Sequence, residues 1–433
     1  MNAESMLGRG AIVALFLQIL GAIANYVAQI FLARWMGTSE YGIYEYVLAC
    51  VVLLAILTAL GLPGAVLRLI PEYRVKQDRS QLRGLLQGSL PIVFGMGLSI
   101  AAIGSVLILY VDFLQHWMYS QPLLLGLWLI PFLSAIDLQS EIARAVGRIV
   151  LARAPRLVIL PSAIILIAFF ARTNNLKINS FTILSGSILV LAAIALFQFW
   201  QLDQIFRTQT ETVKPVYDIK AWFGVALPLL LSTSFLIILN QTDILMLGMW
   251  GSPAVVGIYS VVAKTAQWVS FFLQAVNTVV APMFSTLYTQ GDRRALQALV
   301  SKTAQWIFYP TILCAGLAIV YIDSILGLFG SEFAAARWQA IVLIGGQCVN
   351  ALSGSVGYLL VMTGHQRKMS KVLGYSALTN IILNAFLIPQ FAGLGAAIAT
   401  AITMAMWNIW MYILVVKHLG IQASALATFV VKD

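Results

Sequence analysis

Arg68, Asp243 and Lys264 are charged side chains that fall inside long apolar stretches of this 433-residue sequence. A charge in an apolar medium is costly, so such groups usually face a cavity or a partner. Asp243 and Lys264 lie in consecutive stretches at depths that differ by about 5 Å, at about 1.5 Å of rise per helical residue. A lysine stem can cross that distance. Two interpretations are open: a charged lining in which Lys264 binds an anionic group and Asp243 serves coupling or gating, or a structural ion pair between adjacent helices.

Arg68 lies at the end of an apolar stretch, shortly before Pro71. A guanidinium group binds phosphate through two parallel hydrogen bonds, so Arg68 is a candidate for binding an anionic headgroup. The alternative is that its side chain simply reaches from the apolar stretch to the interface. Glu45 lies about one turn inside the opposite end of the same stretch, near Arg34. We assign Glu45 and Arg34 either a coupling or gating role or an ion pair at the rim.

Amides and prolines complete the set of candidates. Asn25 and Asn240 lie at matching depths in their apolar stretches, where their amides can bind sugar hydroxyls or, alternatively, form interhelical hydrogen bonds. Pro91 and Pro310 lie in equivalent apolar stretches, and an intrahelical proline removes a hydrogen bond and can kink the helix. Both prolines are hinge candidates, although static bends explain them equally well.

Cofactor chemistry finds no support in the sequence. The cysteines stand singly, without the spacing of metal ligands or of a disulfide framework, and the three histidines lie at the ends of apolar runs. No GxxxxGK[ST] motif is present, which argues against ATP hydrolysis within this chain. We expect no metal, no cofactor and no enzymatic activity.

The elements that carry these residues are transmembrane helices. Hydrophobic residues form 61% of the chain and charged residues 10%, against roughly 45–50% and about 25% in soluble proteins, and the mean hydropathy is +0.91. A bilayer core needs about 20 apolar residues per helix. We predict an all-α membrane protein whose twelve spans lie near 10–34, 41–69, 85–111, 119–139, 150–170, 181–202, 221–249, 254–284, 303–321, 337–362, 372–389 and 393–416.

The positive charges give the orientation. Twenty of the 26 Lys and Arg residues fall on one side of the predicted membrane and four on the other, with Arg68 and Lys264 inside spans. Cytoplasmic loops carry the excess of Lys and Arg, so both termini are predicted to be cytoplasmic. The bias also accounts for the net charge of +10 without nucleic acid as a partner.

The sequence repeats itself after about half its length. At an offset of 215, Asn25 matches Asn240, Trp35 matches Trp250 and the triplet 42–44 matches 257–259, in the letters Gly-Ile-Tyr. Asp78 matches Asp292 after a slip of one residue, whereas the later helices share only Gly147 and Gly364. Six helices per half give a parallel repeat about an axis along the membrane normal. We predict an N-terminal lobe (1–202), a cytoplasmic linker (203–220) and a C-terminal lobe (221–433), with the two lobes facing each other across a cleft.

Three segments resemble the polysaccharide-export, Wzx-type flippases of the multidrug/oligosaccharidyl-lipid/polysaccharide (MOP) exporter superfamily. They are ARWMGTSEYGIYEYVLACVVLLAILTALGLPGAVLRLIPEYR (33–74), LNQTDILMLGMWGSPAVVGIYSVVAKTAQWVSFFLQAVNTVVAPMFSTLYTQGDRRAL (239–296) and TGHQRKMSKVLGYSALTNIILNAFLIPQFAGLGAAIATAI (363–402). The resemblance implies a fold like that of multidrug and toxic compound extrusion (MATE) transporters. It also implies flipping of undecaprenyl-pyrophosphate-linked oligosaccharides by alternating access in a bacterial inner membrane, and glycan polymerases or glycosyltransferases as partners. H+ or Na+ coupling is compatible with it.

The same resemblance gives the candidates their roles. Arg68 and Lys264 would bind the pyrophosphate, and Asn25 and Asn240 the sugar. Helix 1 carries no acid of the kind that multidrug exporters commonly use for cation coupling, and the Arg-Asp pair of lipid II flippases is missing too. The alternatives are a cation-coupled multidrug exporter, a glycan-assembly enzyme and a scaffold for glycosyltransferases. Short outer loops and the lack of a histidine within a span argue against the enzyme.

Overall fold

Helices account for nearly all of the described chain, as the apolar composition predicts. A backbone inside a membrane has no water to bond to, and an α-helix satisfies its peptide groups within one segment. The computed structural model describes residues 3–210 and 213–425, with side chains for 13–207 and 213–425. No strand occurs in these ranges. The predicted all-α membrane fold is confirmed.

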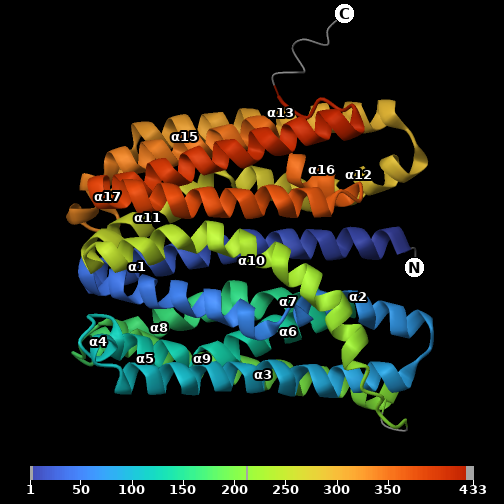
Figure 1. Cartoon of the computed structure of the whole chain (residues 1–433), viewed down its shortest axis with the longest axis horizontal. Coiled ribbons are helices and arrows are strands. Elements are labelled where there is room, and N and C mark those ends of the chain that lie inside the picture. Colours follow the sequence, from blue (N-terminus) through green and yellow to red (C-terminus); the bar gives the residue numbers. More distant parts are fainter. Residues whose placement is uncertain (1–2, 211–212, 426–433) are drawn as a thin grey trace, which may run out of the picture. The chain divides into compact units, whose positions relative to one another are not determined.

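The helices form two compact units, Met1–Ser234 (unit 1) and Phe235–Asp433 (unit 2), drawn in Figure 1. Unit 1 contains α1 (Ala3–Ala59), α2 (Leu62–Val75), α3 (Arg79–Tyr110), α4 (Asp112–Gln115), α5 (Ser120–Leu127), α6 (Ile130–Ala145), α7 (Ile149–Ala154), the π-helix η1 (Pro155–Ile159), α8 (Leu160–Thr173) and α9 (Ser180–Thr210). Unit 2 contains α11 (Pro253–Val269), α12 (Phe271–Gln290), α13 (Arg293–Val320), α14 (Ile322–Gly327), the 3-10 helix η2 (Ser331–Ala336), α15 (Arg337–Ser353), α16 (Val356–Met362) and α17 (Gln366–Leu419).

Helix α10 (Ile219–Trp250) belongs to both units, since the division falls inside it. The repeat places the start of the second lobe at residue 221, within the first turn of this helix. The two divisions differ because the first turns of α10 pack against α2 and α3, although in the repeat α10 corresponds to the first predicted span. The lobe boundaries drawn from the repeat stay a prediction.

Two helices are interrupted by a single non-helical residue. In α1 this residue is Gly37 (φ 77°, ψ 173°), and in α17 it is Ala392 (φ 46°, ψ −126°). The apolar part of α1 covers 47 residues, about 70 Å of helix and roughly twice the bilayer core. Both interruptions lie between predicted spans.

By length and composition, nine stretches of the described chain can cross a membrane, or ten if the bent pair Ser331–Ser353 and Val356–Met362 forms one span. Twelve is reached only if α1 and α17 count as two spans each. The predicted count of twelve therefore stays a prediction.

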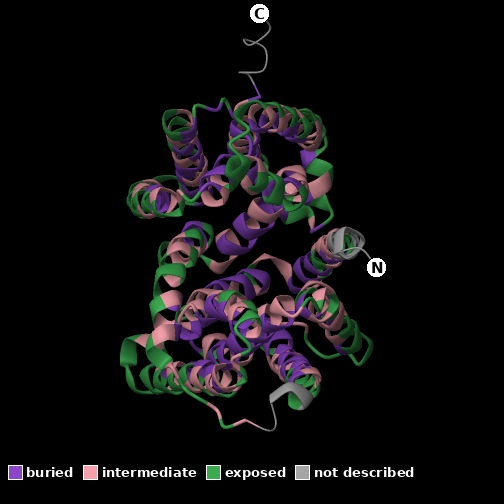
Figure 2. Ribbon diagram, turned by 90° about the vertical axis from the view of Figure 1, so that its right-hand side faces the viewer, coloured by how far each residue is buried: buried purple, intermediate pink, exposed green. Residues whose placement is uncertain are grey.

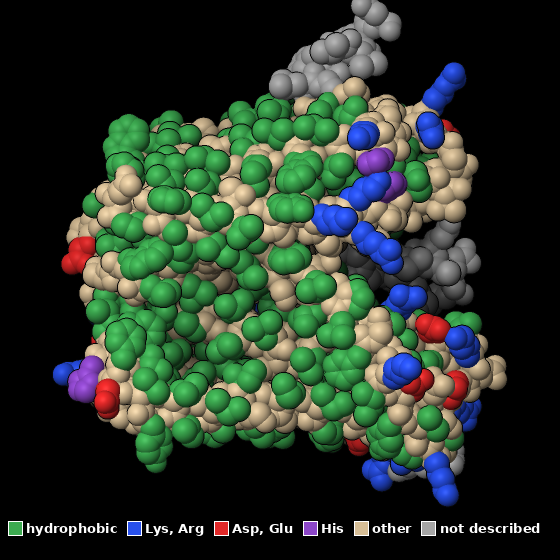
Figure 3. Space-filling view, viewed as in Figure 1, with side chains coloured by type: hydrophobic (Ala, Val, Ile, Leu, Met, Phe, Trp, Pro, Cys, Tyr) green, Lys and Arg blue, Asp and Glu red, His purple; other side chains and the backbone are tan. Residues whose placement is uncertain are grey.

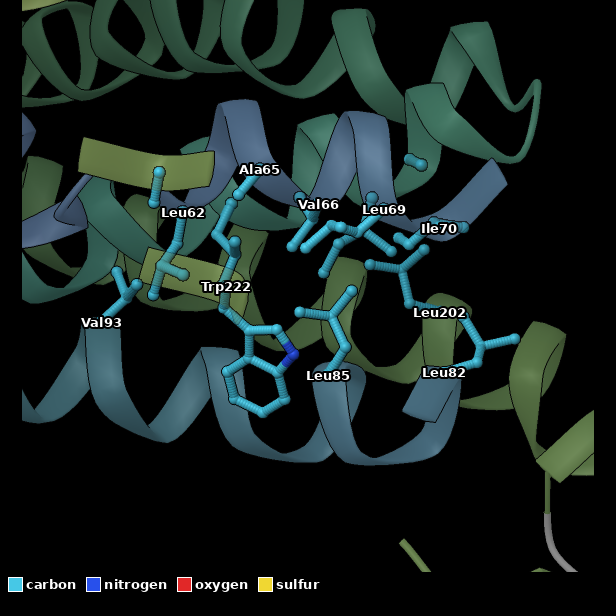
Figure 4. Close-up of a cluster of buried hydrophobic side chains, with 14 of the residues drawn as sticks. Leu62, Ala65, Val66, Leu69, Ile70, Leu82, Leu85, Val93, Leu202 and Trp222 are labelled. Atoms are coloured by element: carbon cyan, nitrogen blue, oxygen red, sulfur yellow. The ribbon is translucent and has the colours of Figure 1, made fainter. Parts of the chain in front are cut away.

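The core of unit 1 lies between α2, α3, α6 and the start of α10 (Figure 4). Trp222 of α10 is fully buried and points between α2 and α3, toward Leu85. Gly88 of α3 allows this approach, because a Cβ there would lie 2.9 Å from Cη2 of the indole. Close packing around small residues stabilises helix association where burial of apolar surface contributes little.

The segment before α10 is attached to α3. Its Val216 N–H donates to the carbonyl of Ser80 at 3.1 Å, and Nη1 of Arg83 donates to the carbonyl of Val213 at 2.6 Å. A Cβ at Gly84 would overlap the carbonyl oxygen of Val216. Residues 203–210 of the predicted linker are helical, as the end of α9, because a helix can continue into polar sequence beyond an apolar span. The non-helical connection is shorter than expected and follows the surface of α3.

The two units share turns of the same geometry at positions that the repeat makes equivalent. Asp78 caps α3 by accepting from the N–H of Gln81 at 3.0 Å, and Asp292 caps α13 by accepting from the N–H of Ala295 at 2.9 Å. The backbone angles of the two aspartates agree within a few degrees (φ −83°, ψ 81° and φ −80°, ψ 81°).

The match between Gly147 and Gly364 is the weakest in the sequence, yet the two glycines have similar backbone geometry. Gly147 and Gly364 both have left-handed φ, 76° and 80°. In each case the glycine N–H bonds back three residues, and the next N–H bonds back five, to Ala143 and to Leu360. The turns after α6 and after α16 therefore share one backbone hydrogen-bond pattern.

A segment after α17 folds back onto unit 2. Gly420 ends the helix in the left-handed conformation, and Ala423 and Ala425 are buried. The N–H of Ala425 donates to the carbonyl of Leu352 at 3.2 Å, next to the interruption between α15 and α16 at Gly354 (φ 68°). This segment therefore bonds a peptide group that the broken helix leaves without its usual partner.

Burial and charge follow the membrane pattern in each unit. Buried residues face the other helices of their own unit and exposed residues face outward (Figure 2). Hydrophobic side chains cover the flanks of the helices, whereas Lys and Arg gather near helix ends (Figure 3). Arg9 and Lys432 belong to the predicted charge bias but lie outside the described side chains. The cytoplasmic location of both termini stays a prediction.

Candidate functional site

The carboxylate of Asp243 joins three helices of unit 2 and is 5% exposed. It accepts from the hydroxyl of Tyr259 on α11, from Oγ1 of Thr400 on α17 at 3.4 Å and from the N–H of Ile244 at 2.9 Å. A buried carboxylate needs such donors because it has lost water. Within the described ranges Lys264 is not a partner of Asp243, so the predicted ion pair between them is not formed.

Lys264 lies on α11, five residues after Tyr259, and is half-buried. Five residues rotate a helix by about 500° at 3.6 residues per turn, so the two side chains leave α11 in directions about 140° apart. Lys264 and Asp243 remain separate candidates within one unit.

Unit 1 buries a different acid. Glu45 is 4% exposed, and Tyr41 and Tyr44 beside it on α1 are 0% and 4% exposed. Arg34 lies before the interruption at Gly37 and is exposed. In the part of the chain whose side chains are described, no ion pair joins Arg34 to Glu45. The interruption at Gly37 separates the two residues, and the predicted rim pair is not found.

The repeat relates these two acidic sites only in part. Tyr44 and Tyr259 are equivalent at the offset of 215, and each lies beside a buried carboxylate. The position equivalent to Asp243 is Ala28, which is buried in unit 1. Each unit therefore holds one acid next to the repeated tyrosine, supplied from a different position. The Gly-Ile-Tyr triplet was the sequence signal for Tyr259, but nothing in the sequence linked it to Asp243 or to Thr400.

The two repeat-related asparagines are exposed. Asn25 accepts from Nε2 of Gln29 at 3.1 Å, and Nδ2 of Asn240 donates to the carbonyl of Leu236 at 2.6 Å. Both partners lie one turn away on the same helix. Among the described side chains neither amide bonds to another helix, so interhelical bonding does not explain them. Their proposed role toward sugar stays a prediction.

Arg68 is exposed on α2. One turn later Glu72 pairs with Lys76 at 2.7 Å, and none of the described acids forms an ion pair with Arg68. The exposed guanidinium is therefore compatible with both interpretations, which are binding of an anionic headgroup and extension of the side chain to the membrane interface.

Pro91 and Pro310 lie inside α3 and α13, which continue through them without a non-helical residue. The interruptions in the backbone occur elsewhere, at Gly37, Gly354 and Ala392. The assignment of Pro91 and Pro310 as hinges stays a prediction.

A metal site of three or more His, Cys, Asp or Glu side chains is not found among the described residues. The Asp243 group offers one carboxylate and two hydroxyl oxygens. Oxygen ligands of this kind suit a proton or a hard monovalent cation better than a transition metal.

The sequence model of a family described as polysaccharide biosynthesis protein matches residues 7–288. A probable low-salt glycan biosynthesis flippase, Agl15 of Haloferax volcanii, is 24% identical over 408 residues, which cover 92% of this chain and 81% of that protein. An uncharacterized membrane protein of Methanocaldococcus jannaschii is 23% identical over 423 residues, 92% of this chain and 82% of that protein.

Solved structures share the fold. An inward-facing MATE family multidrug transporter of the MOP superfamily gives a TM-score of 0.75 at 13% identity and covers 98% of this chain and 100% of its own. The lipid II flippase MurJ in an inward closed conformation gives 0.69 at 14% identity, over 93% of this chain and 87% of its own. A MOP superfamily transporter from Pyrococcus furiosus gives a TM-score of 0.62 at 13% identity, over 96% of this chain and 95% of its own. The predicted MATE-like fold is confirmed.

Proposed function

Because the chain belongs to the polysaccharide biosynthesis protein family, we propose that it flips undecaprenyl-pyrophosphate-linked oligosaccharide units across the membrane for cell-surface polysaccharide assembly. The family match over residues 7–288 carries this proposal. The likeness to a relative described as a glycan biosynthesis flippase supports it. The fold shared with MATE transporters and MurJ supports transport rather than catalysis.

The proposed mechanism is alternating access. The two units open in turn toward the two faces of the membrane, so that a polar headgroup crosses without meeting the hydrocarbon core. Charges and amides on the path replace the water that the pyrophosphate and the sugars lose. Arg68 and Lys264 would bind the pyrophosphate, because both are cationic side chains on otherwise apolar helices. Asn25 and Asn240 would bind sugar hydroxyls, because both amides are exposed.

Asp243 is the proposed coupling residue. Its carboxylate is buried and is bonded to hydroxyl groups from two other helices. Binding of H+ or Na+ neutralises such a group, and its release restores a charge that the apolar surroundings disfavour. A change at Asp243 therefore alters how α10, α11 and α17 pack. Glu45 and Arg34 are the matching candidates for gating in unit 1.

The proposed location is a bacterial inner membrane with both termini in the cytoplasm, and the predicted partners are glycan polymerases or glycosyltransferases. Similar chains also occur in the archaea Haloferax volcanii and Methanocaldococcus jannaschii. Stated more broadly, the proposed location is therefore the plasma membrane of the cell.

A reconstitution tests the transport step. Purified full chain is placed in vesicles with an undecaprenyl-pyrophosphate-linked saccharide, and a membrane-impermeant glycosidase removes the sugar exposed outside. We expect the enzyme to reach nearly all of the sugar in vesicles with protein and about half in vesicles without it. Equal fractions in both would contradict the proposal, and equal flipping of a fluorescent phosphatidylcholine would show that the movement is not selective.

The second candidate function is a cation-coupled multidrug exporter, which the TM-score of 0.75 to a MATE multidrug transporter favours. Deletion of the gene separates the two functions. An exporter predicts greater drug sensitivity with normal surface glycan, whereas a glycan flippase predicts the reverse. A scaffold for glycosyltransferases would instead be supported if a transport-dead variant restored surface glycan.

A further inference from the structure

Two histidines and a lysine meet at the end of unit 2 where α17 ends. His365 lies in the turn between α16 and α17, and His418 lies in the last turn of α17. Their rings stack with centroids 5.5 Å apart and an interplanar angle of 18°. Nζ of Lys368 lies 2.9 Å from Nε2 of His418. Segments 50 residues apart in sequence thus bring three basic groups together.

The hydrogen bonds define the tautomers of both rings. An ammonium group only donates, so Nε2 of His418 accepts from Lys368 and carries no proton. The hydroxyl of Thr363 donates its only proton to the carbonyl of Leu359 at 2.7 Å. It therefore accepts from Nδ1 of His365 at 3.1 Å, and Nε2 of His365 is left without a protein partner among the described residues.

The surroundings of this cluster are cationic. The charges that act on His418 are those of Lys368, His365 and Lys417. Arg367 and Lys371 lie on the same turns of α17, and Figure 3 shows His side chains surrounded by Lys and Arg. None of the described acidic side chains forms an ion pair with any of these residues. The general excess of cations on one side of a membrane explains the presence of Arg367, Lys371 and Lys417. It does not explain why the ammonium group of Lys368 lies against two stacked imidazole rings.

The chemistry selects an anion. A metal ion held by both rings would need the lone pair of Nε2 of His418, which Lys368 already occupies. An anionic oxygen instead finds the remaining N–H groups of Lys368 and the Nδ1–H of His418, and protonation of His365 adds an N–H donor at its Nε2. The cluster lies at a helix end, where phosphate groups of lipids meet the protein surface, and basic pockets at such positions bind lipid headgroups.

We propose that His365, Lys368 and His418 form a binding site for the phosphate group of a membrane lipid. Two sources offer this chemistry: the phosphodiester of an anionic phospholipid and the pyrophosphate of a lipid-linked saccharide. The proposal holds for either source and does not depend on what the protein transports.

The test measures lipid binding by the purified full chain in nanodiscs. One arm adds phosphatidylglycerol to a phosphatidylcholine background, and the other adds undecaprenyl pyrophosphate to the same background. Lys368→Gln and His418→Gln are compared with Lys302→Gln, which also removes one positive charge from unit 2 but whose Nζ lies over the ring of Trp306, 5.1 Å from its centroid. Lys368→Arg keeps the charge and the donors.

We expect Lys368→Gln and His418→Gln each to weaken binding about tenfold in at least one arm, since a charge-assisted hydrogen bond is lost. Lys302→Gln and Lys368→Arg should bind like the wild-type protein. Loss in the phosphatidylglycerol arm identifies a phospholipid as the source, and loss in the pyrophosphate arm identifies a lipid-linked saccharide. Wild-type binding by both Gln variants, or an equal loss in Lys302→Gln, would overturn the proposal. Unchanged thermal midpoints of the variants in detergent show that they remain folded.

Discussion

At the scale of single residues, each unit buries one carboxylate beside a repeated tyrosine. The sequence singles out Asp243 and Lys264, because charges within apolar stretches are few. Hydroxyl residues are common in such stretches, so nothing in the sequence distinguishes Thr400, which lies 157 residues away and donates to Asp243. Charged candidates were predictable from composition, whereas their neutral partners follow only from packing.

Asp243→Asn tests the coupling role. The amide keeps the shape of the side chain and can still accept from Tyr259, but it cannot carry the charge that H+ or Na+ neutralises. We expect the flipping rate to fall about tenfold or more with a normal amount of protein in the membrane, as removing a functional charge typically costs about 1–3 kcal/mol. Asp323→Asn is the matched control, since Asp323 is an exposed acid paired with Arg337 at 2.7 Å. A normal flipping rate in Asp243→Asn would rule out coupling at this residue.

Lys264→Ala tests anion binding in unit 2. We expect less surface glycan at an unchanged level of protein in the membrane, because one of the cations proposed to bind the pyrophosphate is removed. Lys302→Ala removes an exposed cation of the same unit and should leave glycan output unchanged. Normal surface glycan in Lys264→Ala would refute the proposed role.

At the scale of the elements, apolar stretches indicate where helices run but not where they break. Gly37 lies between two predicted spans, and glycine tolerates its positive φ. Ala392 has no such preference. Its φ of 46° occurs where the chain turns back so closely that a Cβ on Gly395 would overlap the carbonyl of Leu387. Interruptions of this second kind depend on contacts that no local pattern contains.

Gly84→Ala tests the attachment of the linker to α3. The new Cβ would overlap the carbonyl oxygen of Val216, so the linker has to move away. We expect a loss of about 1–3 kcal/mol in stability, as for other overpacked sites, and faster tryptic cleavage after Lys214, which is exposed in the linker.

Gly95→Ala is the control on the same helix. A Cβ at Gly95 meets no atom within 4 Å, and alanine is the better helix former by about 1 kcal/mol. Its melting temperature should equal or exceed that of the wild-type protein, with unchanged cleavage. If both variants behave alike, the linker does not depend on close contact at Gly84.

At the scale of the whole molecule, charge gives an orientation that the helices alone do not. Leu176, between α8 and α9, is predicted to lie outside, whereas Lys214, in the linker, is predicted to lie in the cytoplasm. Both residues are exposed. In a variant whose three native cysteines are replaced, Leu176→Cys should react with an impermeant maleimide in intact cells. Lys214→Cys should react only after the membrane is opened, and the reverse pattern would invert the topology.

Helix α10 has a mechanical consequence for any transporter built this way. Ala226 and Leu230 lie against Gly61 in unit 1, and Phe235 lies against Gly374 in unit 2. Between these two attachments lie residues 231–234, about 6 Å of helix at about 1.5 Å per residue. Their sequence is Leu-Ser-Thr-Ser, and the hydroxyl of Thr233 donates to the carbonyl one turn back at 3.1 Å, a bond that favours bending. A bend of α10 within this turn would therefore leave its contacts in unit 1 and its contacts in unit 2 unchanged.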